Sequence, residues 1–124
     1  MAITTIENIQ FSTDIGKNHY SGYAMHGEKV AGILEAGLFR ARPFVMRRNA
    51  LSLDTLQTQP DYRGIGIARI LVDNLIAWGR ENNTISINGY IMAALLVRDV
   101  PEHMAQYLQK LGFTVQENDF WMHL

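Results

Sequence analysis

The chain has 124 residues, which is enough for one hydrophobic core but not for two, so we expect a single domain over residues 1–124. A hydrophobic fraction of 48% and a charged fraction of 19% exclude a disordered chain, and a net charge of −1 gives no overall field that would recruit nucleic acid or an anionic membrane. The absence of cysteine excludes disulfides, a thiol nucleophile and thiolate metal ligands.

Targeting signals and metal-ligand patterns are also missing from the sequence. Residues 1–7 contain neither a basic region nor an apolar signal core. The longest nearly uncharged stretch, 84–97, is too short and too polar to span a bilayer. No two histidines stand at metal-ligand spacing. We therefore expect a cytoplasmic protein that neither binds a membrane nor holds a metal ion.

The N-terminal part of the chain predicts strands. The expected elements are a strand over 3–11, a turn over 14–18, and a hairpin of strands 20–25 and 30–39 around residues 26–29. A helix over 28–40 competes with the second hairpin strand, because its apolar residues also fit a period of 3.6. Gly32 and Gly37 favour the strand, since each glycine costs about 1 kcal/mol in a helix relative to Ala. His19 and His26 lie near turns and are expected to be solvated.

A further strand is predicted over 50–58, and its pattern contains an irregularity. Leu51 and Leu53 point to one face, but the next apolar residue is Leu56, so the alternation slips at Asp54-Thr55. A slip of this kind indicates a β-bulge.

The C-terminal part predicts alternating helices and strands. The expected elements are a helix over 67–81, a strand over 84–91, a helix from Pro101 to Gly112, and short strands over 113–115 and 120–124. A strand–helix–strand order implies parallel pairing of strands 50–58 and 84–91. We therefore expect an α/β fold with three layers and a mixed sheet.

A glycine-containing loop joins strand 50–58 to helix 67–81. It contains Gly64 and Gly66 directly before the helix, where free backbone N–H groups and the helix dipole favour an anion. An ordinary turn that uses glycine for its conformational freedom is the alternative. The full string is Arg63-Gly64-Ile65-Gly66-Ile67-Ala68, preceded by Pro60-Asp61-Tyr62.

This string resembles the coenzyme A signature of the Gcn5-related N-acetyltransferases (GNAT). A second match is Leu111-Gly112-Phe113, which is similar to the motif that closes the last helix of that family. The resemblance implies a central sheet whose parallel strands splay apart at the bulge and open a slot for pantetheine. It also implies acetyl-CoA as co-substrate, with pantetheine held by the backbone of Leu56 and Thr58. The pyrophosphate would be held by the N–H groups of residues 63–68, which are Arg63, Gly64, Ile65, Gly66, Ile67 and Ala68.

Acetylation of an amine needs a group that accepts the amine proton. Asp54 is our first candidate for this base, because it lies on the strand that carries a carboxylate or His in many relatives of this family, and burial would raise its pKa. An Asp that only hydrogen-bonds locally at a bulge is an equally good interpretation. Glu35 is the second candidate.

The sequence also departs from the family pattern. The position of the usual tyrosine acid, five residues before Phe113, is Leu108, and Tyr107 is displaced by about 100° around the helix. Tyr107 could still be the acid, although a core aromatic is the simpler interpretation; Tyr90 could take its place, or the thiolate could leave unassisted.

The helices that usually wall the acceptor site are replaced by a short polar connection over 12–19. An open acceptor face suits a protein amine, and a second subunit, as in a homodimer, could equally supply the wall.

These features together predict an N-acetyltransferase that moves an acetyl group from acetyl-CoA directly to a primary amine of a protein or small molecule. The alternative is a non-catalytic module with the same fold that binds CoA or a protein. A nucleic-acid-binding function is third, based on a basic cluster with one aromatic residue: Arg40, Arg42, Phe44, Arg47 and Arg48.

Overall fold

The computed structural model describes residues 5–39, 49–90 and 101–124. The basic cluster at 40–48 and the segment at 91–100 lie outside the described residues. The strands are β1 (Gln10–Ile15), β2 (His19–His26), β3 (Lys29–Phe39), β4 (Asn49–Thr58), β5 (Thr84–Tyr90), β6 (Thr114–Gln116) and β7 (Asp119–His123). The helices are α1 (Ile67–Glu81), α3 (Pro101–Lys110) and the short 3₁₀ turns η1 (Ile6–Asn8) and η2 (Pro60–Tyr62).

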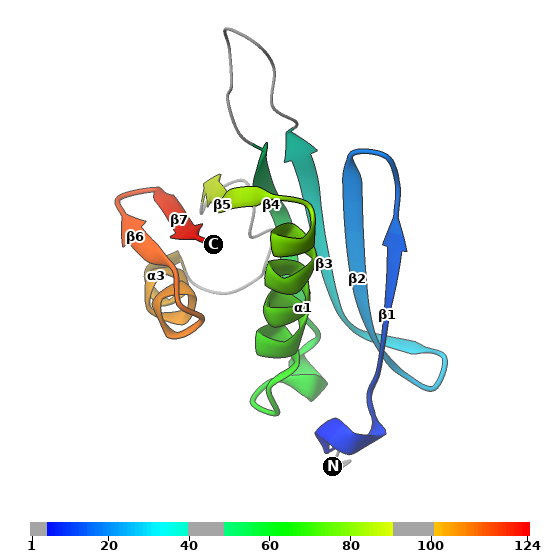
Figure 1. The fold of residues 1–124 in the computed structure, drawn as a ribbon. Helices are drawn as coiled ribbons and strands as arrows, with labels where there is room; N and C mark the ends of the chain where they lie inside the picture. The colour runs from blue at the N-terminus through cyan, green and yellow to red at the C-terminus, as the bar shows by residue number, and fades with distance from the viewer. Residues whose placement is uncertain (1–4, 40–48, 91–100) are drawn as a thin grey trace, which may run out of the picture.

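The strands form one mixed sheet in the order β1-β2-β3-β4-β5-β7-β6 (Figure 1). All neighbouring pairs are antiparallel except β4 and β5, which are parallel as the strand–helix–strand order predicts. The expected α/β fold with a mixed sheet flanked by helices is confirmed.

The hairpin of β2 and β3 confirms the strand interpretation of the segment at 28–40. Gly32 lies opposite the start of α1, where an added Cβ would come within 2.8 Å of Ile67 Cγ2. Glycine therefore allows the N-terminal turn of α1 to approach β3 closely, which no larger residue would permit without a shift.

The beginning of the chain differs from the prediction. The first strand starts at Gln10 rather than at residue 3, and Ile6–Asn8 forms a 3₁₀ turn. Asp14 and Ile15 belong to β1 rather than to the predicted turn, because they pair with Ser21 and Tyr20 across a tight return. The pairing of Asp14 with Ser21 on β2 therefore determines its conformation more strongly than its local preference for turns.

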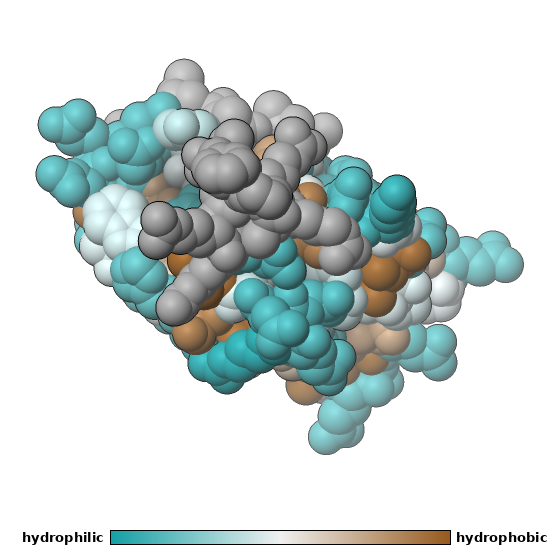
Figure 2. Space-filling view, turned by 45° about the horizontal axis from the view of Figure 1, so that its top comes forward, coloured by the Kyte–Doolittle hydropathy of each residue, from teal (hydrophilic) through white to brown (hydrophobic). Residues whose placement is uncertain are grey.

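The core lies between the sheet and α1, which contacts β2, β3, β4 and β5. The apolar pattern of the predicted helix gives a stripe of Ile67, Ile70, Leu71, Leu75 and Trp78, of which Ile67, Leu71 and Leu75 are buried and Ile70 and Trp78 are only partly buried. The other buried residues of α1 are Ala68, Val72 and Gly79. No helix in the described ranges is long and apolar enough to cross a membrane. The surface in Figure 2 is mostly hydrophilic, with hydrophobic patches between the polar side chains.

Candidate functional site

The parallel strands β4 and β5 separate partway along their length. Their pairing ends at Ser52 and Asn88, while β4 continues to Thr58. On its other side, β4 pairs with β3 through a register shift that skips Asp54. The predicted bulge is therefore confirmed, and the pairing of β4 with β5 ends two residues before it.

The backbone of β4 presents polar groups to the gap left by β5. Gln59 N donates to Ala31 O of β3 at 2.8 Å, whereas the Thr58 carbonyl accepts from Arg63 Nε at 3.1 Å. Thr58 thus points its carbonyl away from β3. Leu56, two residues earlier, directs its backbone groups to the same edge, because strand geometry repeats every two residues. An extended chain laid along this edge would find donors and acceptors as a neighbouring strand does.

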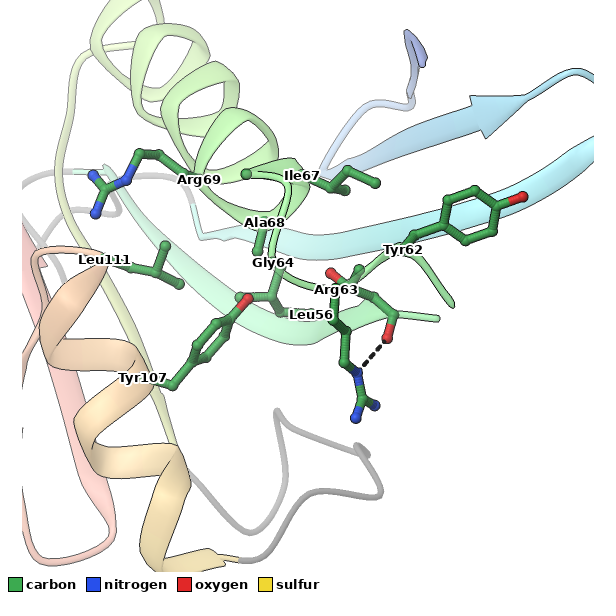
Figure 3. Close-up of a pocket in the computed structure, with 11 residues that line it drawn as sticks. Leu56, Tyr62, Arg63, Gly64, Ile67, Ala68, Arg69, Tyr107 and Leu111 are labelled. Atoms are coloured by element: carbon green, nitrogen blue, oxygen red, sulfur yellow. Dashed lines mark hydrogen bonds between the residues drawn. The ribbon is translucent and has the colours of Figure 1, made fainter. Parts of the chain in front are cut away.

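A cavity of about 460 Å³ opens at this gap, and we call it the cofactor cavity (Figure 3). Seven of the eight predicted cofactor residues line it: Leu56, Thr58, Arg63, Gly64, Gly66, Ile67 and Ala68. The eighth, Ile65, packs against the hydrophobic core instead. Tyr62, Arg69, Tyr107 and Leu111 complete the wall.

The glycine loop ends in a helix N-terminus without a side-chain cap. Gly64 and Gly66 have φ values of 84° and 96°, in the left-handed region that favours glycine. No acidic residue stands in the first turn of α1, although carboxylates are favourable there. The first N–H groups of the helix, at 67–69, have no intrahelical acceptor. The loop therefore offers an anion several N–H donors and the positive end of the helix dipole.

Thr58 supplies a further feature of the cofactor cavity. Its side-chain oxygen is buried and has no hydrogen-bond partner among the residues that the structure describes. A buried hydroxyl without a partner costs free energy, and its place beside the cavity leaves it available to a group bound there. Sequence reasoning assigned Thr58 a backbone contact only, because burial of the hydroxyl depends on how strands and loop pack.

Two contacts hold the wall of the cofactor cavity in place. The Tyr62 hydroxyl lies 2.8 Å from Nδ1 of His26, whose ring meets the tyrosine ring edge to face at 5.5 Å. The Arg69 guanidinium donates to the carbonyl of Lys110 at the end of α3. His26, expected to be solvated, therefore fastens the loop before the glycines to the β2–β3 hairpin.

Helix α3 presents Tyr107 to the cofactor cavity and Leu108 to the core. Figure 3 shows the Tyr107 ring extending from α3 toward the loop and β4. Leu108, at the position of the family's acid, is fully buried. Tyr90, the other candidate acid, does not line the cofactor cavity and is 60% exposed.

The two candidate bases lie outside the cofactor cavity. Asp54 is exposed rather than buried as expected, because the bulge turns its side chain outward. Its Oδ1 accepts a hydrogen bond from Ser52 Oγ at 2.9 Å. Glu35 is partly exposed and lies 3.8 Å from Nε2 of His19, which is 2.7 Å from Ser21 Oγ.

The family model described as "Acetyltransferase (GNAT) family" matches residues 4–113. The chain belongs to the GNAT family. The expected enzyme class, an acyl-CoA-dependent N-acyltransferase, is thereby confirmed at the level of the family. A comparison with curated proteins gives no match.

Solved structures share the GNAT fold at low identity. One is a putative GNAT acetyltransferase from Desulfovibrio desulfuricans (12% identity, TM-score 0.62, 86% of this chain and 69% of that chain). Another is an aminoglycoside acetyltransferase from an uncultured soil metagenomic sample, in complex with sisomicin (14%, TM-score 0.63, 82% and 62%). A third is Arabidopsis thaliana Naa50 with the bisubstrate analogue CoA-Ac-MVNAL (18%, TM-score 0.61, 83% and 70%). The present chain thus spans less than two thirds of the aminoglycoside enzyme.

Proposed function

We propose that the protein transfers an acetyl group from acetyl-CoA to a primary amine by direct transfer. The observation that carries this proposal is the cofactor cavity, which lies beyond the point where β4 and β5 separate. It combines a glycine loop without a side-chain cap and a buried Thr58 hydroxyl that has no partner among the described residues. Each of these features is costly or unused without a ligand.

The residues of the cofactor cavity fit the parts of acetyl-CoA. The N–H groups of residues 63–68 and the guanidinium of Arg63 suit the pyrophosphate. The backbone edge of Leu56 and Thr58 suits the amides of pantetheine, and the Thr58 hydroxyl adds one donor or acceptor. This arrangement would direct the thioester along β4 toward the bulge.

Asp54 is the proposed acceptor of the amine proton at the far end of this path. It lies four positions before Thr58, which is about 13 Å along a strand. In the proposed reaction the neutral amine nitrogen attacks the thioester carbonyl, the carbon–sulfur bond breaks and the sulfur leaves as thiolate. The amine proton passes to Asp54, directly or through a water molecule. Glu35 is the alternative base, two strands away from β5 on β3.

Tyr107 is the proposed donor to the leaving sulfur, since its ring lines the cofactor cavity. A thiolate is a tolerable leaving group on its own, because an ordinary thiol has a pKa near 8.5. The acid is therefore an accelerating group rather than a requirement.

The acceptor is proposed to carry a primary amine. Similar structures were solved with an aminoglycoside and with a peptide-containing bisubstrate analogue, so the fold accommodates small and peptidic partners. A module that binds CoA without turnover is the second candidate, favoured by the buried Leu108 at the acid position.

Mass spectrometry of products tests the proposal. The protein is incubated with acetyl-CoA and a pool of peptides and small amines, and acetylated amines are expected only when active protein is present. Thermal unfolding with and without acetyl-CoA separates the candidates. A raised melting temperature without any product would favour the binding module. If acetyl-CoA neither raises the melting temperature nor yields a product, acyl-CoA recognition is refuted.

A further inference from the structure

A second hollow, of about 560 Å³, lies on the sheet near the point where β4 and β5 separate, and we call it the aromatic groove. Its lining includes the side chains of Phe39, Ser52, Asn88, Tyr90, Asp119 and Trp121. The register places Ser52, Asn88 and Trp121 in one row across β4, β5 and β7. Tyr90 pairs with Asp119 two residues farther along, so their side chains share the same face of the sheet.

The side chains of the aromatic groove combine exposed rings with a carboxylate. Phe39 is 53% exposed and Tyr90 is 60% exposed, and Trp121 is partly exposed. Asp119 is exposed beside them, and no Lys or Arg is among the described residues that line the groove. Aromatic faces and a carboxylate attract an organic cation with an apolar body, whereas their negative potential repels an anion.

The aromatic groove and the cofactor cavity both contact β4, one before and one after the bulge. The groove contacts β4 at 50–52, the cavity contacts it at Leu56 and Thr58, and Asp54 lies between them. Ser52 lines the groove and donates its hydroxyl hydrogen to Asp54. An added Cβ at Gly37, on the β3 position paired with Ser52, would lie 3.7 Å from Asp54 Oδ2, so Asp54 faces the groove side of the sheet.

We propose that the aromatic groove binds the acceptor, and that it selects a primary ammonium group carried on an aromatic or apolar body. The inference rests on the proposed function and adds the substrate class. Asp119 and the rings of Tyr90, Phe39 and Trp121 would hold the cation and its apolar part, and Asp54 would take the proton as the amine becomes a nucleophile.

Matched amines test this selection. 2-Phenylethylamine and n-propylamine each carry one primary ammonium group but differ in the ring, and sisomicin is a polar polyamine. We expect kcat/KM for phenylethylamine to exceed the values for the other two by tenfold or more. Equal values, or a preference for sisomicin, would overturn the inference while leaving acetyl transfer intact.

Variants test the groove itself. Tyr90→Ala and Asp119→Asn should each raise KM for phenylethylamine about 2- to 5-fold, the order expected of exposed cation–π and ion-pair contacts, with KM for acetyl-CoA unchanged. Ile85→Ala is the control, because Ile85 is an exposed apolar residue of β5 that lines neither hollow. An effect of Ile85→Ala as large as that of Tyr90→Ala would overturn the assignment.

Binding without chemistry separates the two proposals. If no amine is acetylated, the proposed function fails. Binding of phenylethylamine to the groove is then measured by calorimetry with CoA-saturated protein. Binding that Asp119→Asn weakens supports the groove. Absence of binding overturns it, as does a dimer in sedimentation that Tyr90→Ala dissociates, because the face would then be an interface between two copies.

Discussion

Replacing Thr58 by Val should move stability and ligand affinity in opposite directions. The change keeps the branched shape of the side chain and removes the buried hydroxyl, which has no partner in the described part of the chain. Without ligand, the hydroxyl only costs free energy, so its removal should stabilise the fold. With acetyl-CoA, the same hydroxyl is proposed to form a hydrogen bond, so its removal should weaken binding.

The expected magnitudes follow from the burial of the hydroxyl. An unsatisfied buried hydroxyl costs about 1–3 kcal/mol, so Thr58→Val should raise the free energy of unfolding by about that amount and the melting temperature by several degrees. A net hydrogen bond contributes about 0.5–1.5 kcal/mol, so the Kd for acetyl-CoA should rise about 2- to 12-fold.

Thermal unfolding over a series of acetyl-CoA concentrations measures both effects. At a hundred times Kd the ligand should add about 2.7 kcal/mol to the wild-type protein, and the variant should need more ligand for the same shift. Thr58→Ser, which keeps the hydroxyl, is the control and should bind nearly as the wild type does. A less stable Thr58→Val protein with unchanged affinity would refute the reasoning, because the hydroxyl would then have a partner within the folded protein or a bound water.

Four further changes test other parts of the site and core. Gly66→Val should abolish the acetyl-CoA-induced rise in melting temperature, because Val disfavours φ of 96° at the helix start; a circular dichroism spectrum checks that the fold survives, and a retained shift would argue against the loop. Asp54→Asn should lower kcat about 10²- to 10⁴-fold with acetyl-CoA affinity intact, and a loss seen only in Glu35→Gln would move the base to Glu35. Tyr107→Phe should lower kcat about a hundredfold at unchanged melting temperature, and a silent variant would mean that the thiolate leaves without an acid. Burial raises the pKa of Tyr20 above its ordinary value of 10.0, so the folded state holds this proton more tightly than the unfolded chain does. Stability from this group is complete below pH 10 and falls as pH rises through the folded-state pKa, and urea unfolding between pH 9 and 11 should show a smaller decline in Tyr20→Phe.

Local sequence patterns predicted the elements that carry the cofactor cavity. Helix 67–81 has both its apolar stripe and its glycine start within one stretch of chain, and its observed bounds are those predicted. The bulge at Asp54 was visible because a slip in alternation is itself a local signal, and the structure shows the skipped pairing there. Features of this kind depend on residues a few positions apart, which a single sequence displays directly.

Features made by several strands left no comparable signal. The aromatic groove takes Phe39 from β3, Tyr90 from β5 and Trp121 from β7, and only the strand order brings these rings to one face. The contact of His26 with Tyr62 spans 36 positions along the chain. The outward direction of Asp54 also required the structure, because a bulge can turn a side chain to either face.

The end of α3 shows how one residue of offset decides which side chain can act on the sulfur. Counting back from Phe113 identifies Leu108, but the rotation of the helix is fixed by its C-terminal cap. Gly112, at φ of 102°, donates its N–H to Gln109 O at 3.0 Å, and Phe113 N donates to Leu108 O at 3.0 Å. This cap holds Leu108 in the core and leaves Tyr107, about 100° away, on the side of the cofactor cavity. A tyrosine restored at 108 would have to place its hydroxyl among buried apolar side chains, at a cost of about 1–3 kcal/mol and without reaching the cavity. In this chain, therefore, an acid for the leaving thiolate can come from Tyr107 but not from the position that the family pattern names.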